Sequence, residues 1–153
     1  MEIRPARRED LDAVRRLLAD AALPLDGLED QFGSGYAVAV ESGRLTGAAG
    51  VERYGRYGLL RSVITAPDRR GRGIGEALVR DRLDWAGQEG LEEVYLLTTT
   101  GASYFPRLGF MPVAREKVPA EIRASGEFSS VCPSSAVVML CPLGTPGSGG
   151  ARP

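Results

Sequence analysis

Hydrophobic positions along the chain follow two different spacings. Over residues 8–22, apolar side chains recur every three or four positions, including Leu11, Val14 and Leu18, and the same spacing returns over about 73–89. This period predicts two amphipathic helices. Shorter helices are predicted over 25–32, 102–108 and 119–124. Short apolar runs predict strands over 2–4, 35–41, 45–54, 59–65, 93–98, 110–114 and 135–140.

The order of these elements mixes the two types along the whole chain, with a long central helix between two strands. We therefore predict an α/β fold, a mixed twisted sheet of about six or seven strands with helices on both faces. A length of 153 residues fits one domain, which we assign to residues 1–143. Residues 144–153 are rich in Gly, Pro and Ser and are expected to form a disordered tail.

Composition narrows the classes of function. The net charge of −1 gives no general attraction to nucleic acid or membrane, and no apolar run approaches the length of about 18 residues that a membrane span needs. The chain has no histidine, the commonest zinc ligand and general base, so no metal is expected. Only Cys132 and Cys141 are present, and the first residues lack a signal-peptide core, so we expect a cytoplasmic protein.

A basic, glycine-rich loop stands between the predicted strand 59–65 and the central helix. It reads RRGRGIG over residues 69–75. A strand, a glycine loop and a helix start form a phosphate site, because the first N–H groups of the helix have no internal partner. The loop lacks the Lys-Ser/Thr of a nucleotide P-loop and the glycine spacing of a Rossmann fingerprint. Three arginines without interleaved aromatics are too small a footprint for nucleic acid.

The spacing Arg70-x-x-Gly73-x-Gly75 resembles the acetyl-CoA loop of the GNAT N-acetyltransferase superfamily. The resemblance implies acetyl-CoA as co-substrate and a GNAT fold, in which the central strand and the strand after the central helix splay apart around the coenzyme. It also places a backbone donor for the thioester carbonyl at about Val63 or Ile64, on a bulged strand. The coenzyme-binding residues expected from it are Val63, Ile64, Thr65, Arg70, Gly71, Arg72, Gly73, Ile74, Gly75, Glu76, Thr99, Tyr104, Phe105 and Arg107.

Acetyl transfer to an amine needs a base for the amine and an exit for the thiolate. Many members of this superfamily carry a glutamate on the central strand, but this strand has Arg61 and Ser62 instead. Glu52, one strand earlier, is the candidate base, acting directly or through water. Alternatively, Glu52 is a solvated strand-edge glutamate or the ion-pair partner of Arg61 or Arg53.

Tyr104 is the candidate general acid, although the resemblance predicts a tyrosine one position later, where this chain has Phe105. The alternative is that Tyr104 packs or lines the coenzyme channel while the thiolate leaves unaided. A thiol with a pKa of about 8.5 needs little protonation help near neutral pH.

Arg61 stands inside an otherwise apolar strand, where an arginine needs a partner. It is expected either to clamp a carboxylate of the acceptor or to pair with Glu52, and its five donors allow both. Ser62, Thr98 and Ser134 are the other candidate substrate-binding residues. The polar stretch that contains Ser134 either lines the acceptor pocket or simply leads into the last strand.

A closer resemblance covers nearly the whole chain, from about Ile3 to Leu140. The segments LLRSV, YLLTTT, YFPRLGF and VPAEIRASGEFSSVCPSSAVVM are similar to the small N-acetyltransferases encoded with arsenic-resistance genes. That group also has phenylalanine at the position of Phe105. Short amino-acid acetyltransferases that make N-acetylglutamate resemble the chain in the same regions. Both resemblances imply a small amino acid or amino-acid-like amine as acceptor.

Two further expectations come from the resemblance at the level of the whole protein. A GNAT-shaped module that binds an acyl-CoA without turnover is the alternative to an enzyme, because the base and acid both depart from the common pattern. Superfamily members often pair through their late strands, so a homodimer is expected at the family level.

Overall fold

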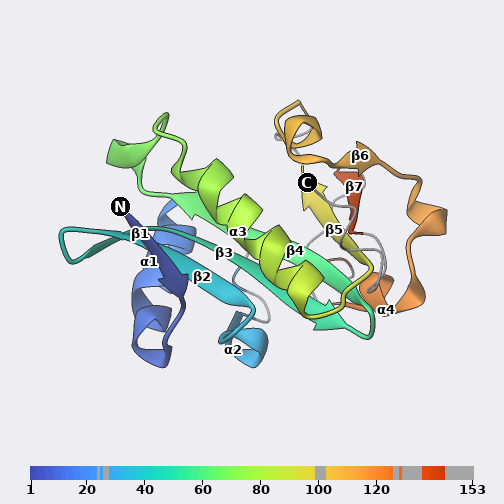
Figure 1. Cartoon of the computed structure of the whole chain (residues 1–153), viewed down its shortest axis with the longest axis horizontal. Helices are drawn as coiled ribbons and strands as arrows, with labels where there is room; N and C mark the ends of the chain where they lie inside the picture. The colour runs from blue at the N-terminus through green and yellow to red at the C-terminus, as the bar shows by residue number, and fades with distance from the viewer. Residues whose placement is uncertain (24, 26–27, 99–102, 126–127, 129–135, 144–153) are drawn as a thin grey trace.

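The computed structural model describes residues 1–23, 25, 28–98, 103–125, 128 and 136–143. Within these residues the chain forms one seven-stranded sheet in the order β1-β2-β3-β4-β5-β7-β6 (Figure 1). The strands are β1 (Glu2–Pro5), β2 (Tyr36–Glu41), β3 (Arg44–Tyr54), β4 (Tyr57–Thr65), β5 (Glu93–Thr98), β6 (Met111–Pro112) and β7 (Val137–Pro142). The α/β fold predicted from the sequence is confirmed.

All neighbouring strands are antiparallel except the central pair, β4 and β5. These two parallel strands pair only from Tyr57 opposite Glu93 to Leu59 opposite Tyr95. Both continue beyond that point, β4 to Thr65 and β5 to Thr98. The two strands therefore separate toward their carboxyl ends, which is the splay that the family resemblance implied.

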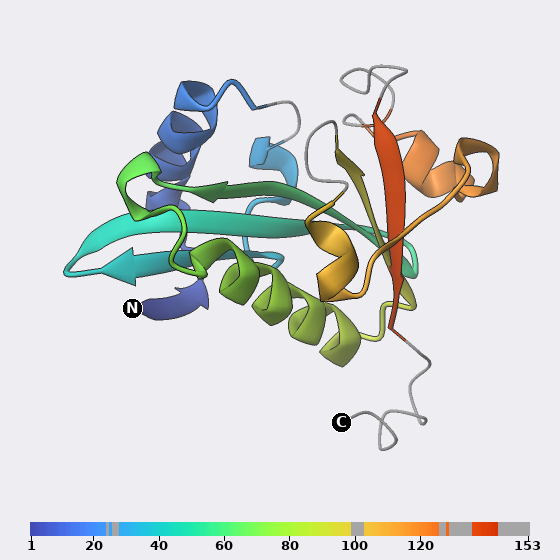
Figure 2. The same ribbon diagram turned by 90° about the horizontal axis from the view of Figure 1, so that it is seen from above.

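Helices cover both faces of the sheet, as Figure 2 shows. Helices α1 (Leu11–Asp20), α2 (Leu28–Gln31) and α4 (Ala120–Arg123) lie on one face, and α3 (Ile74–Gln88) lies on the other. On the α1 face, Val14 and Leu18 pack in one cluster with Tyr36 and Ile64. Ile74 and Leu78 of α3 pack in another cluster with Ala37, Ala39 and Ala49, so the two sides of the sheet have separate cores.

The central helix α3 owes its placement to its apolar stripe and its glycine ends. Ile74, Leu78, Val79 and Ala86 are buried against the sheet, and full burial of each large apolar side chain contributes about 1.5–3 kcal/mol. The helix ends at Gln88, two residues before Gly90, whose φ of 82° is the left-handed conformation of a common helix stop.

Several predicted elements are shorter in the structure. The helix predicted over 25–32 is the single turn α2, and the strand predicted over 110–114 is the two-residue β6. The helix predicted over 102–108 is a 3-10 turn, η3 (Phe105–Leu108), in its described part. Another 3-10 turn, η1 (Arg8–Asp10), precedes α1. The proposed tail, 144–153, lies outside the described residues.

Among the described residues, no helix has both the length and the apolar character needed to cross a membrane.

Candidate active site

Strand β4 carries a bulge where the two central strands begin to separate. Gly50 of β3 pairs with Arg61 and Ala48 pairs with Ile64, so Ala49 stands opposite both Ser62 and Val63. Ser62 has a φ of 60°, in the left-handed region, which costs a non-glycine residue on the order of 1 kcal/mol. Its buried Oγ receives no hydrogen bond from any described residue.

A bulge leaves a backbone N–H outside the regular ladder and redirects the strand. Val63 and Ile64, the expected carbonyl donors, directly follow the left-handed residue, and Thr65 ends the strand. The structure therefore brings the predicted donor segment to the opening between β4 and β5.

The glycine loop then leads into α3 with two left-handed residues. Gly71 and Gly73 both have a φ of 81°, and a Cβ added at either position would meet nothing within 4 Å. Glycine is required there by backbone conformation rather than by space. Gly73 is the N-cap of α3 and no side chain caps the helix, so the first N–H groups, from Ile74 onward, point at the loop without a side-chain acceptor. This arrangement suits an anionic group.

The three loop arginines divide into two kinds. Arg69 is folded back, with its Nε 2.9 Å from Glu41 Oε1 and its Nη1 3.2 Å from Asp68. Asp68 in turn pairs with Arg44 at 2.8 Å, and this guanidinium lowers the pKa of Asp68 to about 2. Arg69 thus ties the loop to the β2–β3 hairpin.

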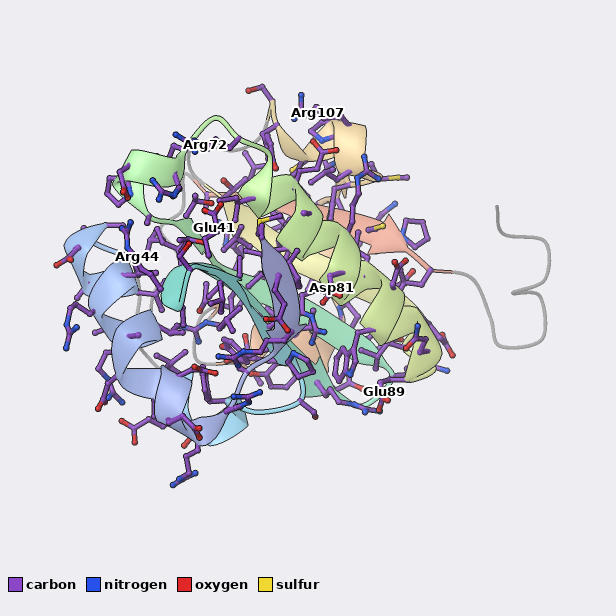
Figure 3. The ribbon with its side chains drawn as sticks, turned by 60° about the vertical axis from the view of Figure 1, so that its left-hand side comes forward. Glu41, Arg44, Arg72, Asp81, Glu89 and Arg107 are labelled. Carbon is purple, nitrogen blue, oxygen red and sulfur yellow. The ribbon has the colours of Figure 1, made fainter. Side chains whose placement is uncertain are left out.

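Arg70 and Arg72 are exposed, and neither forms an ion pair with another described residue. Figure 3 shows Arg72 at the start of α3 and Arg107 at the same end of the helix, while Glu89 lies at the other end. The guanidinium groups of Arg70 and Arg72 can therefore contact an anion beside the helix N-terminus.

The 3-10 turn η3 brings Tyr104 to the same place. An added Cβ at Gly75 would lie 3.5 Å from Thr65 Oγ1 and 3.9 Å from the Tyr104 hydroxyl. The Arg107 guanidinium lies over the Tyr104 ring, 5.0 Å from its centroid. Glu76 accepts from Arg107 Nη2 at 3.0 Å and from Arg80 Nε at 3.1 Å.

The Phe105 ring lies 5.7 Å from that of Phe110 and 5.1 Å from that of Tyr104, and both residues pack against the core cluster that contains Val79 of α3. Of the two neighbouring aromatic residues, Tyr104 is the one that reaches the start of α3.

On the opposite face of the sheet, β3 and β4 hold a buried ion pair. Arg61 Nη1 lies 3.1 Å from Glu52 Oε2, and the two side chains are only 1% and 3% exposed. Glu52 is thus not a solvated strand-edge glutamate, and Arg53, another candidate partner, pairs instead with Glu89 at 2.7 Å. The sequence left these alternatives open, and the structure shows the Arg61 pair.

Tyr54, to which the sequence alone assigned no role, completes this polar group. Its hydroxyl donates to Glu52 Oε1 at 2.7 Å. Burial, followed by this hydrogen bond, raises the pKa of Tyr54 well above its usual value, so the hydroxyl keeps its proton. The signal in the sequence was the spacing of Glu52 and Tyr54, because residues two apart on a strand face the same side.

The remaining predicted residues are placed as follows. Thr98 is half-buried at the end of β5, opposite Val137 of β7. Thr99 and Ser134 lie outside the described residues. In the part of the chain that the structure describes, no group of three or more His, Cys, Asp or Glu side chains is arranged to hold a metal ion.

The comparison with family models matches residues 3–110 to the Acetyltransferase (GNAT) family. No curated protein matches the chain at a significant level.

Many solved structures are similar. Rv2747 from Mycobacterium tuberculosis, in complex with CoA and NLQ, has 26% identity and a TM-score of 0.80, over 94% of this chain and 99% of that one. N-acetylglutamate synthase from Neisseria gonorrhoeae, complexed with coenzyme A and N-acetyl-glutamate, has 20% identity and a TM-score of 0.79. That alignment covers 93% of this chain but 35% of the synthase.

The ribosomal-protein-S18-alanine N-acetyltransferase from Escherichia coli is similar at 19% identity and a TM-score of 0.74, over 95% of this chain and 96% of that chain. At such identities the likeness shows the fold alone.

Proposed function

The chain belongs to the GNAT acetyltransferase family and is an acetyl-CoA-dependent N-acetyltransferase; from this premise we propose that its acceptor is the amino group of a small amino acid or an amino-acid-like compound. The single observation that carries the proposal is Arg61, an arginine buried next to the bulge of β4. A guanidinium in that position is suited to hold a carboxylate of the acceptor beside the reacting group.

The residues at the start of α3 fit the coenzyme. Left-handed Gly71 and Gly73, an N-terminus without a side-chain cap, and the exposed Arg70 and Arg72 together form a site for a diphosphate. The coenzyme supplies the thioester whose acetyl group is transferred. The opening between β4 and β5 leads from this site to the bulge, and that path supports placing the thioester near Val63 and Ile64.

In the proposed step, the amine nitrogen forms a bond to the thioester carbonyl carbon, and the carbon–sulfur bond breaks. An N–H of Val63 or Ile64 donates to the carbonyl oxygen and stabilises the charge that develops there. Glu52, directly or through water, takes the proton that the ammonium group must lose before it attacks, and the nitrogen releases a second proton to water as the carbon–sulfur bond breaks. The Tyr104 hydroxyl, which lies near Thr65 and Gly75, returns a proton to the thiolate, or the thiolate leaves unaided.

Arg61 has donors for more than one carboxylate. Its Nη1 contacts Glu52, and a guanidinium has five N–H groups in all, so an acceptor carboxylate and Glu52 can be held by one side chain. The Neisseria synthase, which shares the fold over part of its length, was solved with N-acetyl-glutamate, so an amino-acid acceptor is compatible with a protein that contains this fold.

Two narrower acceptors follow from the motifs in the sequence. The extended resemblance to acetyltransferases encoded with arsenic-resistance genes favours an arsenical analogue of an amino acid, and the second resemblance favours glutamate. The family assignment favours turnover over the alternative of a non-catalytic acyl-CoA sensor.

A thiol-release assay tests the proposal. Purified protein and acetyl-CoA are mixed with glutamate, aspartate, neutral amino acids or an arsenical amino acid, and free CoA is followed with a thiol reagent. We expect turnover with at least one α-amino acid and at least tenfold slower turnover with the amine that lacks its carboxylate. Equal rates with and without the carboxylate, or turnover with none of these amines, would contradict it.

A further inference from the structure

The buried carboxylate of Glu52 is held at both of its oxygens. Oε2 accepts from Arg61 Nη1 at 3.1 Å, and Oε1 accepts from the Tyr54 hydroxyl at 2.7 Å. The first contact spans two strands, and the second links positions two apart on β3. A carboxylate with one donor at each oxygen cannot turn without breaking a charge-assisted hydrogen bond.

Register places this group beside the bulge. Gly50, two residues before Glu52, pairs with Arg61, and an added Cβ at Gly50 would lie 2.3 Å from the Tyr36 ring. Tyr36, Tyr54, Glu52 and Arg61 therefore share the sheet face that carries α1. Tyr54 lies farther from the bulge along β3 than Glu52 does, and its hydroxyl bonds to the Glu52 carboxylate.

We propose that Tyr54 is a positioning residue for acetyl transfer: its hydroxyl fixes the Glu52 carboxylate, which in turn fixes the Arg61 guanidinium where the acceptor binds. The proposal rests on the proposed function. It assigns no contact between Tyr54 and acceptor or coenzyme. Without the Tyr54 hydroxyl, Oε1 of the buried Glu52 carboxylate loses this donor. A buried carboxylate oxygen that has lost its donor turns toward another one.

The chain supplies a matched control on β5, which is separated from β3 by β4. The Tyr95 hydroxyl donates to Glu93 Oε1 at 2.7 Å, again from two positions along a strand. Burial likewise comes first among the causes that raise the pKa of Tyr95, followed by the bond to Glu93. Arg61 does not take part in this second pair. Tyr95→Phe therefore removes the same kind of hydrogen bond on β5, at residues to which the proposal assigns no role.

The first experiment compares Tyr54→Phe with Tyr95→Phe in steady-state kinetics, with thermal melting as a check on folding. For Tyr54→Phe we expect kcat/KM for the acceptor to fall about tenfold, the effect of losing a hydrogen bond to a charged group, while the Kd for acetyl-CoA changes less than twofold. Tyr95→Phe should change neither. Equal kinetic effects of the two variants, or a matching loss of acetyl-CoA affinity in Tyr54→Phe, would overturn the proposal.

The second experiment is a double-mutant cycle with Glu52→Gln. If Tyr54 acts through Glu52, adding Tyr54→Phe to Glu52→Gln should change kcat/KM less than twofold. Multiplying effects of the two substitutions would overturn the proposal and leave the proposed function standing. A wild-type protein that acetylates no amine would overturn both.

Discussion

One irregular residue, Ser62, determines how the residues on either side of it are arranged at the proposed site. The left-handed backbone of Ser62 inserts an extra residue opposite Ala49, and the strand beyond it changes register. Arg61, just before the bulge, faces the α1 side and pairs with Glu52. Val63 and Ile64, just after it, carry the N–H groups proposed to bind the thioester oxygen. The bulge thus places the proposed acceptor clamp next to the proposed carbonyl donor.

The clamp predicts a selective change in Michaelis constants. Arg61→Ala should raise KM for a carboxylate-bearing acceptor far more than KM for acetyl-CoA, because only the acceptor loses its partner. This variant also leaves Glu52 buried without its guanidinium, which costs on the order of 3–5 kcal/mol. Arg61→Lys keeps the charge but loses the two-point contact, and should raise the acceptor KM about tenfold or more in a stable protein. An equal rise in both KM values would make Arg61 structural.

Glu52 as base predicts a large loss of rate without loss of coenzyme binding. Glu52→Gln keeps the shape of the side chain but cannot take a proton, so kcat should fall on the order of 10²–10⁴-fold. The measurement is kcat at saturating acetyl-CoA and acceptor, with the Kd for acetyl-CoA as the control. An unchanged kcat in Glu52→Gln would point to proton loss through water alone.

Among the elements, the start of α3 separates structural from binding arginines. Arg69 is engaged by Glu41 and Asp68, whereas Arg70 and Arg72 are exposed beside an N-terminus without a side-chain cap. A sequence motif alone gives all three the same weight. The difference comes from the β2–β3 hairpin, which reaches the loop only in the folded chain.

This division predicts opposite phenotypes for loop variants. The double substitution Arg70→Ala and Arg72→Ala should raise the Kd for acetyl-CoA about tenfold or more, since each lost contact is charge-assisted. Its melting temperature should stay near that of the wild type. Arg69→Ala should do the reverse, with nearly normal binding and a stability loss of at most about 1 kcal/mol. Weakened binding in Arg69→Ala alone would reverse the assignment.

At the scale of the whole molecule, two acidic side chains tie loops to the sheet and make stability depend on pH. Hydrogen bonds from Arg4 lower the pKa of Asp10, and those from Arg44 lower the pKa of Asp68 to about 2. A carboxyl whose pKa is lower in the folded state stabilises the fold above its unfolded pKa, near 3.9. That contribution is lost as the pH falls through the folded-state value.

Asp10→Asn should therefore be less stable than the wild type at pH 6, by about 1–2 kcal/mol. Asp10 accepts from Arg4 and from the backbone N–H of Arg7, and the amide retains only part of this. The difference should shrink as the pH is lowered from 4 to 2, because Asp10 of the wild type becomes protonated. Urea unfolding at several pH values measures it, and a constant difference would show that the pair is not the cause.

Much of the fold could be predicted from the chain because its signals are local. The period of α3, the glycines that bound it and the apolar run of β4 each depend on neighbouring residues. The burial of Arg82 could not be predicted from such local signals. This side chain is buried inside the stripe of α3 because its Nη1 donates to the carbonyl of Ser34, 48 positions away, and its guanidinium lies 5.2 Å from the Trp85 ring centroid.

The candidate site also divides into features with local signals in the sequence and features that depend on distant residues. The coenzyme loop was visible in the sequence because its glycines and arginines are consecutive. The bulge at Ser62 depends on the register between β3 and β4, and the contact of Arg61 with Glu52 depends on that register too, whereas Tyr54 and Glu52 lie two positions apart on one strand. No local pattern distinguishes a buried glutamate held at both oxygens from a solvated one.

Acetyl transfer by this chain depends on coenzyme binding at the start of α3. Titration calorimetry of acetyl-CoA into the purified protein, repeated with the Arg70→Ala and Arg72→Ala double variant, tests it most directly. We predict one-site binding to the wild type that weakens about tenfold or more in the variant and also weakens with added salt. No heat of binding to the wild type, or the same affinity in the variant, would contradict the account.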